Sequence, residues 1–279
     1  MADLRPMELG EILDASLMIY RRHFGLLLQL GVAALWLPVS LTIYIQLAGG
    51  EQQHLVLFIA TGVIQYFAGL FLTAGAIRVI SDSYLGRPPQ LRDALALGVS
   101  KIWPLFVVGF GKALVLGLLA GIAGLAAAAF ILPSVAAGAK AVGVIGVFAL
   151  LVLGLWFTIF VACGYGVTTQ VVVLEELSSA FDAFGRSWEL TRTFKRKIFA
   201  LAVVAFIIFF VPVLVVSGLN AYFTLRAPSV GQAFSVLVAL LPIVMTPLLA
   251  CVFTLMYYDL RVRREAFDLE LLGRQLGIV

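Results

Sequence analysis

Lys112 is the residue whose position most strongly suggests chemistry, because it lies deep inside a long apolar run. It lies about 14 Å along a helix beyond Trp103, and no acidic residue lies at comparable depth. Placing a lysine there costs at least ~2.5 kcal/mol on insertion scales, so an intramembrane cation is a candidate for function. Two interpretations stay open. Lys112 grips a lipid phosphate or an anionic substrate, or it snorkels along a tilted span to the headgroups.

Basic clusters that follow amphipathic segments form a second set of candidates for lipid or anion binding. They are Arg21, Arg22, Arg192, Lys195, Arg196 and Lys197. Each such residue near an anionic membrane surface contributes ~1 kcal/mol of attraction, so the clusters predict contact with phospholipid. Ordinary topology signalling produces the same residues, and this alternative has equal weight.

The sequence predicts no catalytic residue, no metal site and no cofactor. The only histidines, His23 and His54, are expected on opposite sides of the membrane, and HExxH, GxSxG and Walker motifs are missing. Cys163 and Cys251 both fall inside apolar runs without a CxxC motif, as expected for packing residues. The net charge of +4 is explained by a membrane-facing surface, so nucleic-acid binding is not expected. We therefore expect a protein that is not an enzyme.

Long apolar runs must position these candidate residues. Hydrophobic residues make up 62% of the chain and charged residues 12%, with a mean hydropathy of +1.09, which is far from the composition of a water-soluble domain. Runs of about 20 apolar residues are long enough to cross the bilayer as helices. Six spans are predicted: 24–47, 55–77, 103–132, 141–165, 198–222 and 233–257.

The spans group into three repeated units, about 5–80, 87–165 and 174–257, followed by a tail over 258–279. The units align through the Asp-Ala pairs at Asp14, Asp93 and Asp182, each followed by basic residues and an aromatic residue. The predicted fold is all-α, a single membrane domain of three transmembrane hairpins. An amphipathic interfacial helix precedes each hairpin, over 5–22, 87–101 and 174–197.

Helical spacing assigns an apolar face to each of these amphipathic segments, and the face of the second segment is weaker and comprises Leu91, Leu95, Val99 and Ile102. In the first, the face comprises Leu9, Ile12, Leu13, Ser16 and Tyr20; in the third, it comprises Leu177, Ala180, Phe181, Phe184, Trp188 and Thr191.

Glycine and proline residues make further predictions about the spans. Gly117, Gly121 and Gly124 form a small-residue stripe, which predicts close helix packing and a central place in the bundle for the third span. Pro212, Pro242 and Pro247 are helix-kink candidates. The last two could also divide the sixth span into half-helices, as in some transporters.

The distribution of basic residues predicts the orientation. Of the 19 Lys and Arg residues, only Lys140 and Arg226 lie in the hairpin turns and Lys112 within a span. The positive-inside rule then places both termini and all amphipathic segments in the cytoplasm. The expected location is the bacterial inner membrane, with multiple passes.

Three segments resemble those of a bacterial polytopic membrane family: RPMELGEILDASLMIYRRHFGLL, VLEELSSAFDAFGRSWELTRTFKRKIF and YYDLRVRREAFDLELL. The family is labelled glycerophosphoryl diester phosphodiesterase membrane domain, and includes uncharacterised six-helix membrane proteins. The resemblance covers essentially the whole chain. In the namesake enzymes it implies a membrane module attached to a phosphodiesterase barrel, but this sequence lacks the barrel and its metal ligands. The resemblance therefore implies the fold without the activity.

Two functional hypotheses follow. The first is a non-enzymatic inner-membrane protein that interacts with phospholipids or scaffolds a membrane partner, which would be another membrane protein or a second copy of the chain. The second is a small permease or lipid-handling transporter that uses Lys112 and a proline-broken sixth helix.

Overall fold

The computed structural model describes residues 5–48, 53–136 and 140–265, and in these ranges every regular element is a helix. The helices are α1 (Leu9–Arg22), α2 (Phe24–Leu47), α3 (Leu55–Tyr84), α4 (Leu91–Ala136), α5 (Lys140–Gly164), α6 (Thr168–Leu174), α7 (Asp182–Thr191), α8 (Lys195–Arg226) and α9 (Pro228–Glu265). Within the described ranges, six segments are long and apolar enough to cross a membrane. The chain is therefore a helical membrane protein with multiple candidate spans. The part of the predicted tail beyond Glu265 lies outside the described residues.

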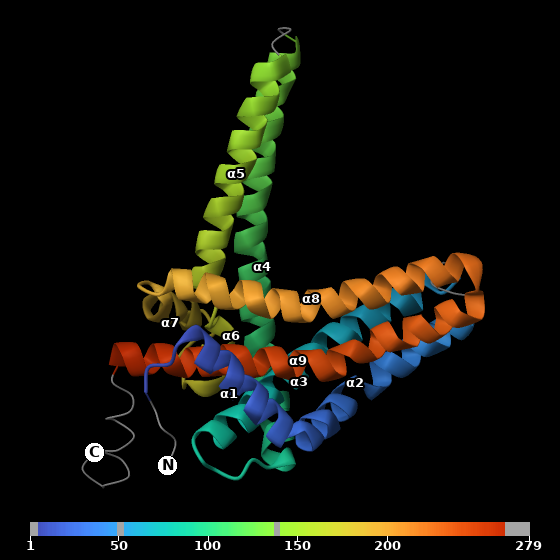
Figure 1. Ribbon diagram of the computed structural model, residues 1–279, viewed down its shortest axis with the longest axis vertical. Helices are drawn as coiled ribbons and strands as arrows, with labels where there is room; N and C mark the ends of the chain where they lie inside the picture. Colours follow the sequence, from blue (N-terminus) through green and yellow to red (C-terminus); the bar gives the residue numbers. More distant parts are fainter. Residues whose placement is uncertain (1–4, 49–52, 137–139, 266–279) are drawn as a thin grey trace.

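Among the long helices, the most extensive packing is of α4 with α5, α8 with α9, α3 with α4 and α2 with α3. In Figure 1, α4 and α5 run up the view as one pair, whereas α2, α3, α8 and α9 extend together across it. α9 also contacts α1, α2 and α3, so it connects most of the lower group. The α4–α5 pair thus projects away from the other long helices along most of its length.

The buried core lies where the helix pairs meet, not along their far ends. Residues Leu72–Ser81 of α3, Thr168–Val173 of α6 and Cys251–Leu260 of α9 contribute many of the buried side chains. In α4, only 6% of the most apolar 18-residue segment is buried. The outer parts of the long helices therefore leave apolar side chains exposed, as expected for surfaces that face lipid.

α1 packs onto protein with the face that its sequence pattern predicts. A capping box between Glu8 and Glu11 starts the helix. Ile12 and Ser16 are fully buried, and the Tyr20 hydroxyl donates to the carbonyl of Val244 on α9 at 3.0 Å. The apolar face of α1 is thus covered by other helices and not left for the membrane interface.

The second predicted amphipathic helix does not exist as a separate element, which corrects the sequence prediction. Residues Leu91–Lys101 are the first turns of α4, which continues without a break for 46 residues to Ala136. The weak apolar face of this segment joins the apolar run that follows it, and no turn or other break separates the two. Pro104 falls inside α4 and is tolerated, because helices continue through a proline when neighbouring groups compensate.

The third predicted amphipathic helix, over 174–197, is helical beyond Leu174 only in α7 (Asp182–Thr191) and from Lys195, where α8 begins, which is a second correction. α6 ends at Leu174, residues 175–181 are not regular helix, and α7 begins at Asp182. The Asp182 carboxylate accepts hydrogen bonds from the Ser178 hydroxyl (2.7 Å) and the Ser179 amide (2.9 Å), and an acidic side chain in the first turn of α7 complements the helix dipole. Leu177 and Ala180 therefore precede the helix. Its buried face is Ala183, Ser187, Leu190 and Thr191, whereas Phe181 is exposed.

The small-residue stripe of α4 does not pack against the described part of the chain. A Cβ atom added at Gly117, Gly121 or Gly124 would meet no heavy atom within 4 Å. The close approach of α4 and α5 occurs instead at glycines of α5. A Cβ added at Gly154 would lie 2.3 Å from the Cβ of Ala123, and one at Gly146 would lie 2.0 Å from the Phe130 ring. The prediction that the stripe makes α4 central in the bundle is wrong.

Two glycine-to-alanine variants are expected to change the free energy of unfolding in opposite directions. Gly154→Ala forces α4 and α5 apart and should lower the free energy of unfolding by about 1–3 kcal/mol. Gly117→Ala meets open space and should raise it by about 0.5 kcal/mol, because alanine favours helix more than glycine does. Thermal unfolding of both variants in the same detergent checks this. Equal destabilisation by the two changes would show that the stripe is buried against something.

All three kink candidates lie inside unbroken helices. Pro212 lies within α8, and Pro242 and Pro247 lie within α9, which runs continuously from Pro228 to Glu265. The sixth span is thus not divided into half-helices, and that part of the transporter hypothesis is wrong. Pro247 leaves the Ile243 carbonyl without its helical donor. This carbonyl faces Gly31 of α2, where an added Cβ would lie 3.0 Å from the oxygen.

Candidate functional site

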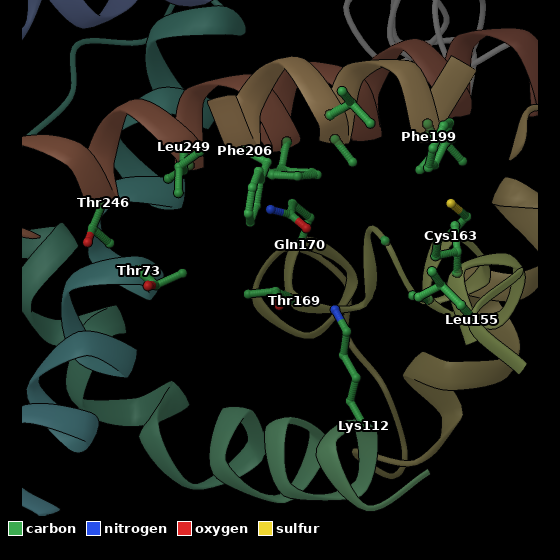
Figure 2. A pocket seen from close by; sticks show the side chains of 18 residues that line it. Thr73, Lys112, Leu155, Cys163, Thr169, Gln170, Phe199, Phe206, Thr246 and Leu249 are labelled. Carbon is green, nitrogen blue, oxygen red and sulfur yellow. The ribbon is translucent and has the colours of Figure 1, made fainter. Parts of the chain in front are cut away.

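A cavity of about 810 Å³ lies between the α4–α5 pair and the α8–α9 pair, with α6 and Thr73 of α3 completing its wall. Figure 2 shows its lining side chains converging from these helices. Its volume lies in the range of ligand-binding pockets. Most of the lining is apolar, and the polar side chains are Thr73, Lys112, Thr169, Gln170 and Thr246. The cavity therefore combines an apolar wall with a few polar groups.

Lys112 supplies the charge in this cavity. Its side chain extends from α4 toward the turn between α5 and α6 (Figure 2), and its Nζ donates to the carbonyl of Tyr165 at 3.2 Å. An ammonium group has three donors, and this carbonyl is the only hydrogen-bond acceptor found for Lys112 among the described residues. No carboxylate in the described ranges lies within ion-pair distance of it. The cation is therefore only partly compensated.

The turn between α5 and α6 explains why a carbonyl is available at this place. α5 ends at Gly164 and α6 begins at Thr168, so the Tyr165 carbonyl lies outside regular helix. It accepts from the Thr168 hydroxyl at 2.9 Å as well as from Lys112. The carbonyl of Gly164, the last residue of α5, accepts from the hydroxyls of Ser187 (2.9 Å) and Thr191 (3.0 Å) of α7. α7 thus fixes the end of α5, and the end of α5 in turn fixes Lys112.

Gln170 is the second polar group of note in the cavity wall. It lies on α6, is 4% exposed, and extends into the same space as Lys112 (Figure 2). Its Oε1 atom is buried and has no hydrogen-bond partner among the described residues. Leaving a buried acceptor unpaired costs about 1–3 kcal/mol. Because the unpaired Gln170 acceptor faces a cavity, a ligand or a water molecule is expected to donate a hydrogen bond to it.

Apolar side chains at the edge of the cavity are exposed. Leu155 on α5 and Phe199, Val203 and Phe206 on α8 line the cavity and are 40–61% exposed. A soluble protein would rarely leave such a set uncovered, whereas a surface that faces lipid tails does so without cost. The cavity thus opens between α5 and α8 toward the expected bilayer.

The predicted basic residues occupy three kinds of environment. Arg21, Arg22, Arg192 and Arg196 are exposed. The Lys195 ammonium lies over the rings of Phe160 (3.3 Å) and Trp188 (3.6 Å) as a cation–π contact. Lys197 is bound to Asp259 at 2.6 Å. These residues do not line the cavity and do not join Lys112.

Lys197 belongs to a buried polar cluster that the sequence did not suggest. The fully buried Asp259 carboxylate accepts from Lys197, from Arg263 of α9 (3.1 Å) and from the Met7 amide (2.7 Å). The Met7 carbonyl accepts from Lys197 (2.5 Å) and Arg263 (2.8 Å) in return. We call Met7, Lys197, Asp259 and Arg263 the Asp259 cluster. It ties the segment before α1 to α8 and α9, so Lys197 is committed to the fold and not available to lipid.

From the sequence, Thr169 and Gln170 could line a polar cavity, but interhelical hydrogen bonds explain them equally well and their spacing forms no motif; the sequence did not point to Thr246. The available signal was a polar residue within an apolar run, which Gln170 provides. Many buried polar residues in membrane helices make only interhelical hydrogen bonds, so the signal alone cannot select one.

The described residues contain no group of three or more His, Cys, Asp or Glu side chains that could hold a metal ion. Cys163 and Cys251 are free and buried, and Cys163 lines the cavity.

Comparison with known proteins identifies no relative. No family model matches the chain, no curated protein matches it, and no solved structure matches it.

Proposed function

We propose that this is a multi-pass membrane protein that binds an anionic phospholipid in the cavity around Lys112. The observation that carries the proposal is a lysine ammonium, with a single carbonyl acceptor and no acid partner among the described residues, in an otherwise apolar cavity. The phosphate of a lipid would supply the missing negative charge, and its acyl chains would lie against the exposed apolar edge of the cavity.

The proposal includes an orientation and a family. The positive-inside distribution supports cytoplasmic termini in a bacterial inner membrane. The cavity then lies toward the cytoplasmic side, because its wall includes α6 and the residues Ile198 and Phe199, which directly follow the basic cluster that ends at Lys197. We retain the resemblance to the membrane domain of the glycerophosphoryl diester phosphodiesterase family as part of the proposal, without its enzymatic activity.

Lys112→Met is expected to reduce binding of an anionic phospholipid at least tenfold while the protein remains folded. A charge-assisted hydrogen bond contributes about 1.5–3 kcal/mol, which is more than a tenfold change in affinity. The variant should be at least as stable as the wild type, because it removes a poorly compensated cation from an apolar site. Native mass spectrometry with phosphatidylglycerol and phosphatidylcholine of the same chains measures the change.

Lys101→Met is the matched control. Lys101 also lies on α4 and also donates to a backbone carbonyl, that of Val172 on α6, at 2.8 Å. It does not line the cavity. Lipid binding should therefore survive this change. If both variants lose lipid equally, or if neither does, Lys112 is not the headgroup contact.

A lipid-handling transporter is the second candidate, because a cavity that reaches Lys112 is what this function requires. The continuous α9 removes the unwound backbone that the sequence suggested as its binding site. Transfer of fluorescent phosphatidylglycerol between leaflets of proteoliposomes tests it. If the protein is a transporter, lipid transfer should be faster with the wild type than with Lys112→Met. If it only binds lipid, the two transfer rates should be the same.

A further inference from the structure

Gln170 indicates which headgroup the cavity would select. Its carboxamide is buried, its Oε1 atom has no partner among the described residues, and it extends into the cavity that holds Lys112 (Figure 2). A carboxamide offers both an acceptor and donors, whichever way round it is placed. Lys112 offers only donors. The two residues therefore present different chemistry to one ligand.

An anionic headgroup with hydroxyl groups satisfies both residues. Its phosphodiester accepts from the Lys112 ammonium, and a hydroxyl pairs with the Gln170 amide, because hydroxyl groups both donate and accept. A phosphate alone has no donor for Oε1 when ionised. A choline headgroup also has no hydrogen-bond donor, and an ethanolamine headgroup brings a second ammonium toward Lys112, which like-charge repulsion disfavours.

We propose that the cavity is a selective site for an anionic phospholipid with a hydroxylated headgroup, which Lys112 holds by its phosphate and Gln170 by a hydroxyl. This inference rests on the proposed lipid-binding function and goes further, because it assigns the class of headgroup and a specificity-determining residue. A site that rejects a ligand lacking one hydroxyl does so because its own buried polar group is then left unpaired.

Two lipids that differ only in the headgroup hydroxyls provide the test. Phosphatidylglycerol and phosphatidylethanol of identical acyl chains each carry one negative charge, but only the first has free hydroxyl groups. The full-length protein in detergent should bind phosphatidylglycerol about fivefold more tightly, which corresponds to one well-formed hydrogen bond. Gln170→Leu should lower phosphatidylglycerol binding to the level of phosphatidylethanol and leave phosphatidylethanol binding unchanged.

A second measurement separates specificity from folding. Thr254 on α9 is also fully buried with an unpartnered oxygen, but it does not line the cavity. Thr254→Val and Gln170→Leu should both leave the unfolding temperature unchanged or higher, because each removes an unpaired buried polar atom. Only Gln170→Leu should abolish the lipid preference. Loss of preference in both variants would overturn the role of Gln170.

The remaining outcomes distinguish the two levels of the proposal. If the wild type binds both anionic lipids equally and Lys112→Met loses both, the headgroup inference fails and the proposed function stands. If neither anionic lipid binds better than phosphatidylcholine, the proposed function itself fails. Displacement of phosphatidylglycerol by soluble glycerol 3-phosphate would show that the site takes a free phosphate ester, and would overturn its assignment to a lipid.

Discussion

Asp259→Asn is expected to lower the free energy of unfolding by about 3 kcal/mol, the largest effect of any single change considered for this protein. Asp259 is fully buried and receives two cationic side chains, Lys197 and Arg263. Asparagine keeps the shape of the side chain but removes the charge, so both cations lose their carboxylate. Removing one member of a buried charge cluster costs about 3–5 kcal/mol, and the lower value applies because Lys197 and Arg263 are partly exposed.

The loss of the Asp259 charge should also loosen the N-terminal segment that precedes α1. The Asp259 cluster holds Met7 against α8 and α9, and Met7 lies directly before α1. Proteolysis near the N-terminus should therefore become faster in Asp259→Asn, because the segment that precedes α1 loses its anchor.

Unfolding in detergent, followed by tryptophan fluorescence, measures the effect of Asp259→Asn. Asp14→Asn is the matched control, because it makes the same chemical change at an exposed position of α1, and it should alter stability by no more than about 0.5 kcal/mol. If Asp259→Asn changes stability as little as the control does, the Asp259 cluster contributes little to the stability of the fold.

Arg186→Met is expected to lower the free energy of unfolding by about 2 kcal/mol. Arg186 of α7 binds Glu175 at 2.9 Å, Glu189 at 3.6 Å and also Glu265 at the end of α9. Glu175 accepts from the Tyr257 hydroxyl at 2.8 Å, so the same carboxylate also contacts α9. Methionine keeps much of the packing volume but leaves Glu175 and Glu265 without this cation. The estimate is lower than for Asp259, because all of these groups are partly exposed.

The guanidinium should hold this network together at any pH at which the protein is handled. Burial alone would lower the pKa of Arg186, but hydrogen bonding to Glu175 and the charges of Glu175 and Glu265 raise the pKa above its ordinary value. Arg186 therefore stays protonated.

Arg92→Met is the control for Arg186→Met, because Arg92 is exposed and has no ion pair among the described residues. The two variants should be compared by unfolding in the same detergent. If they unfold at the same temperature, the link from α7 to α9 through Arg186 does not stabilise the fold.

The amphipathic segments show where local patterns mislead. Leu91–Lys101 has a weak apolar face and forms the first turns of α4, whereas residues 174–197 have a strong pattern but are irregular at 175–181 and at 192–194. In both cases the periodicity predicts helical residues without predicting where a helix starts or ends. Local contacts of a few residues set such boundaries, for example the hydrogen bonds that the Ser178 hydroxyl and the Ser179 amide donate to the Asp182 carboxylate, and the wider pattern does not weigh them.

The basic residues show the same limit for function. Lys195, Arg196 and Lys197 are neighbours in sequence. However, Lys195 packs on aromatic rings, Arg196 is exposed, and Lys197 binds Asp259. A cluster in sequence is not a cluster in space, because successive residues of a helix point in directions about 100° apart.

The sequence alone determined the class of this protein and its main candidate residue. Apolar runs of membrane-spanning length must become helices, because only a helix satisfies its own backbone hydrogen bonds within lipid, and a lysine inside such a run is costly wherever the helix lies. The tertiary structure alone decided the surroundings of that lysine. The approach of α5, α6, α8 and α9 creates the cavity and brings Gln170 to it. Such contacts join residues far apart in the chain, and local periodicity contains no information about them.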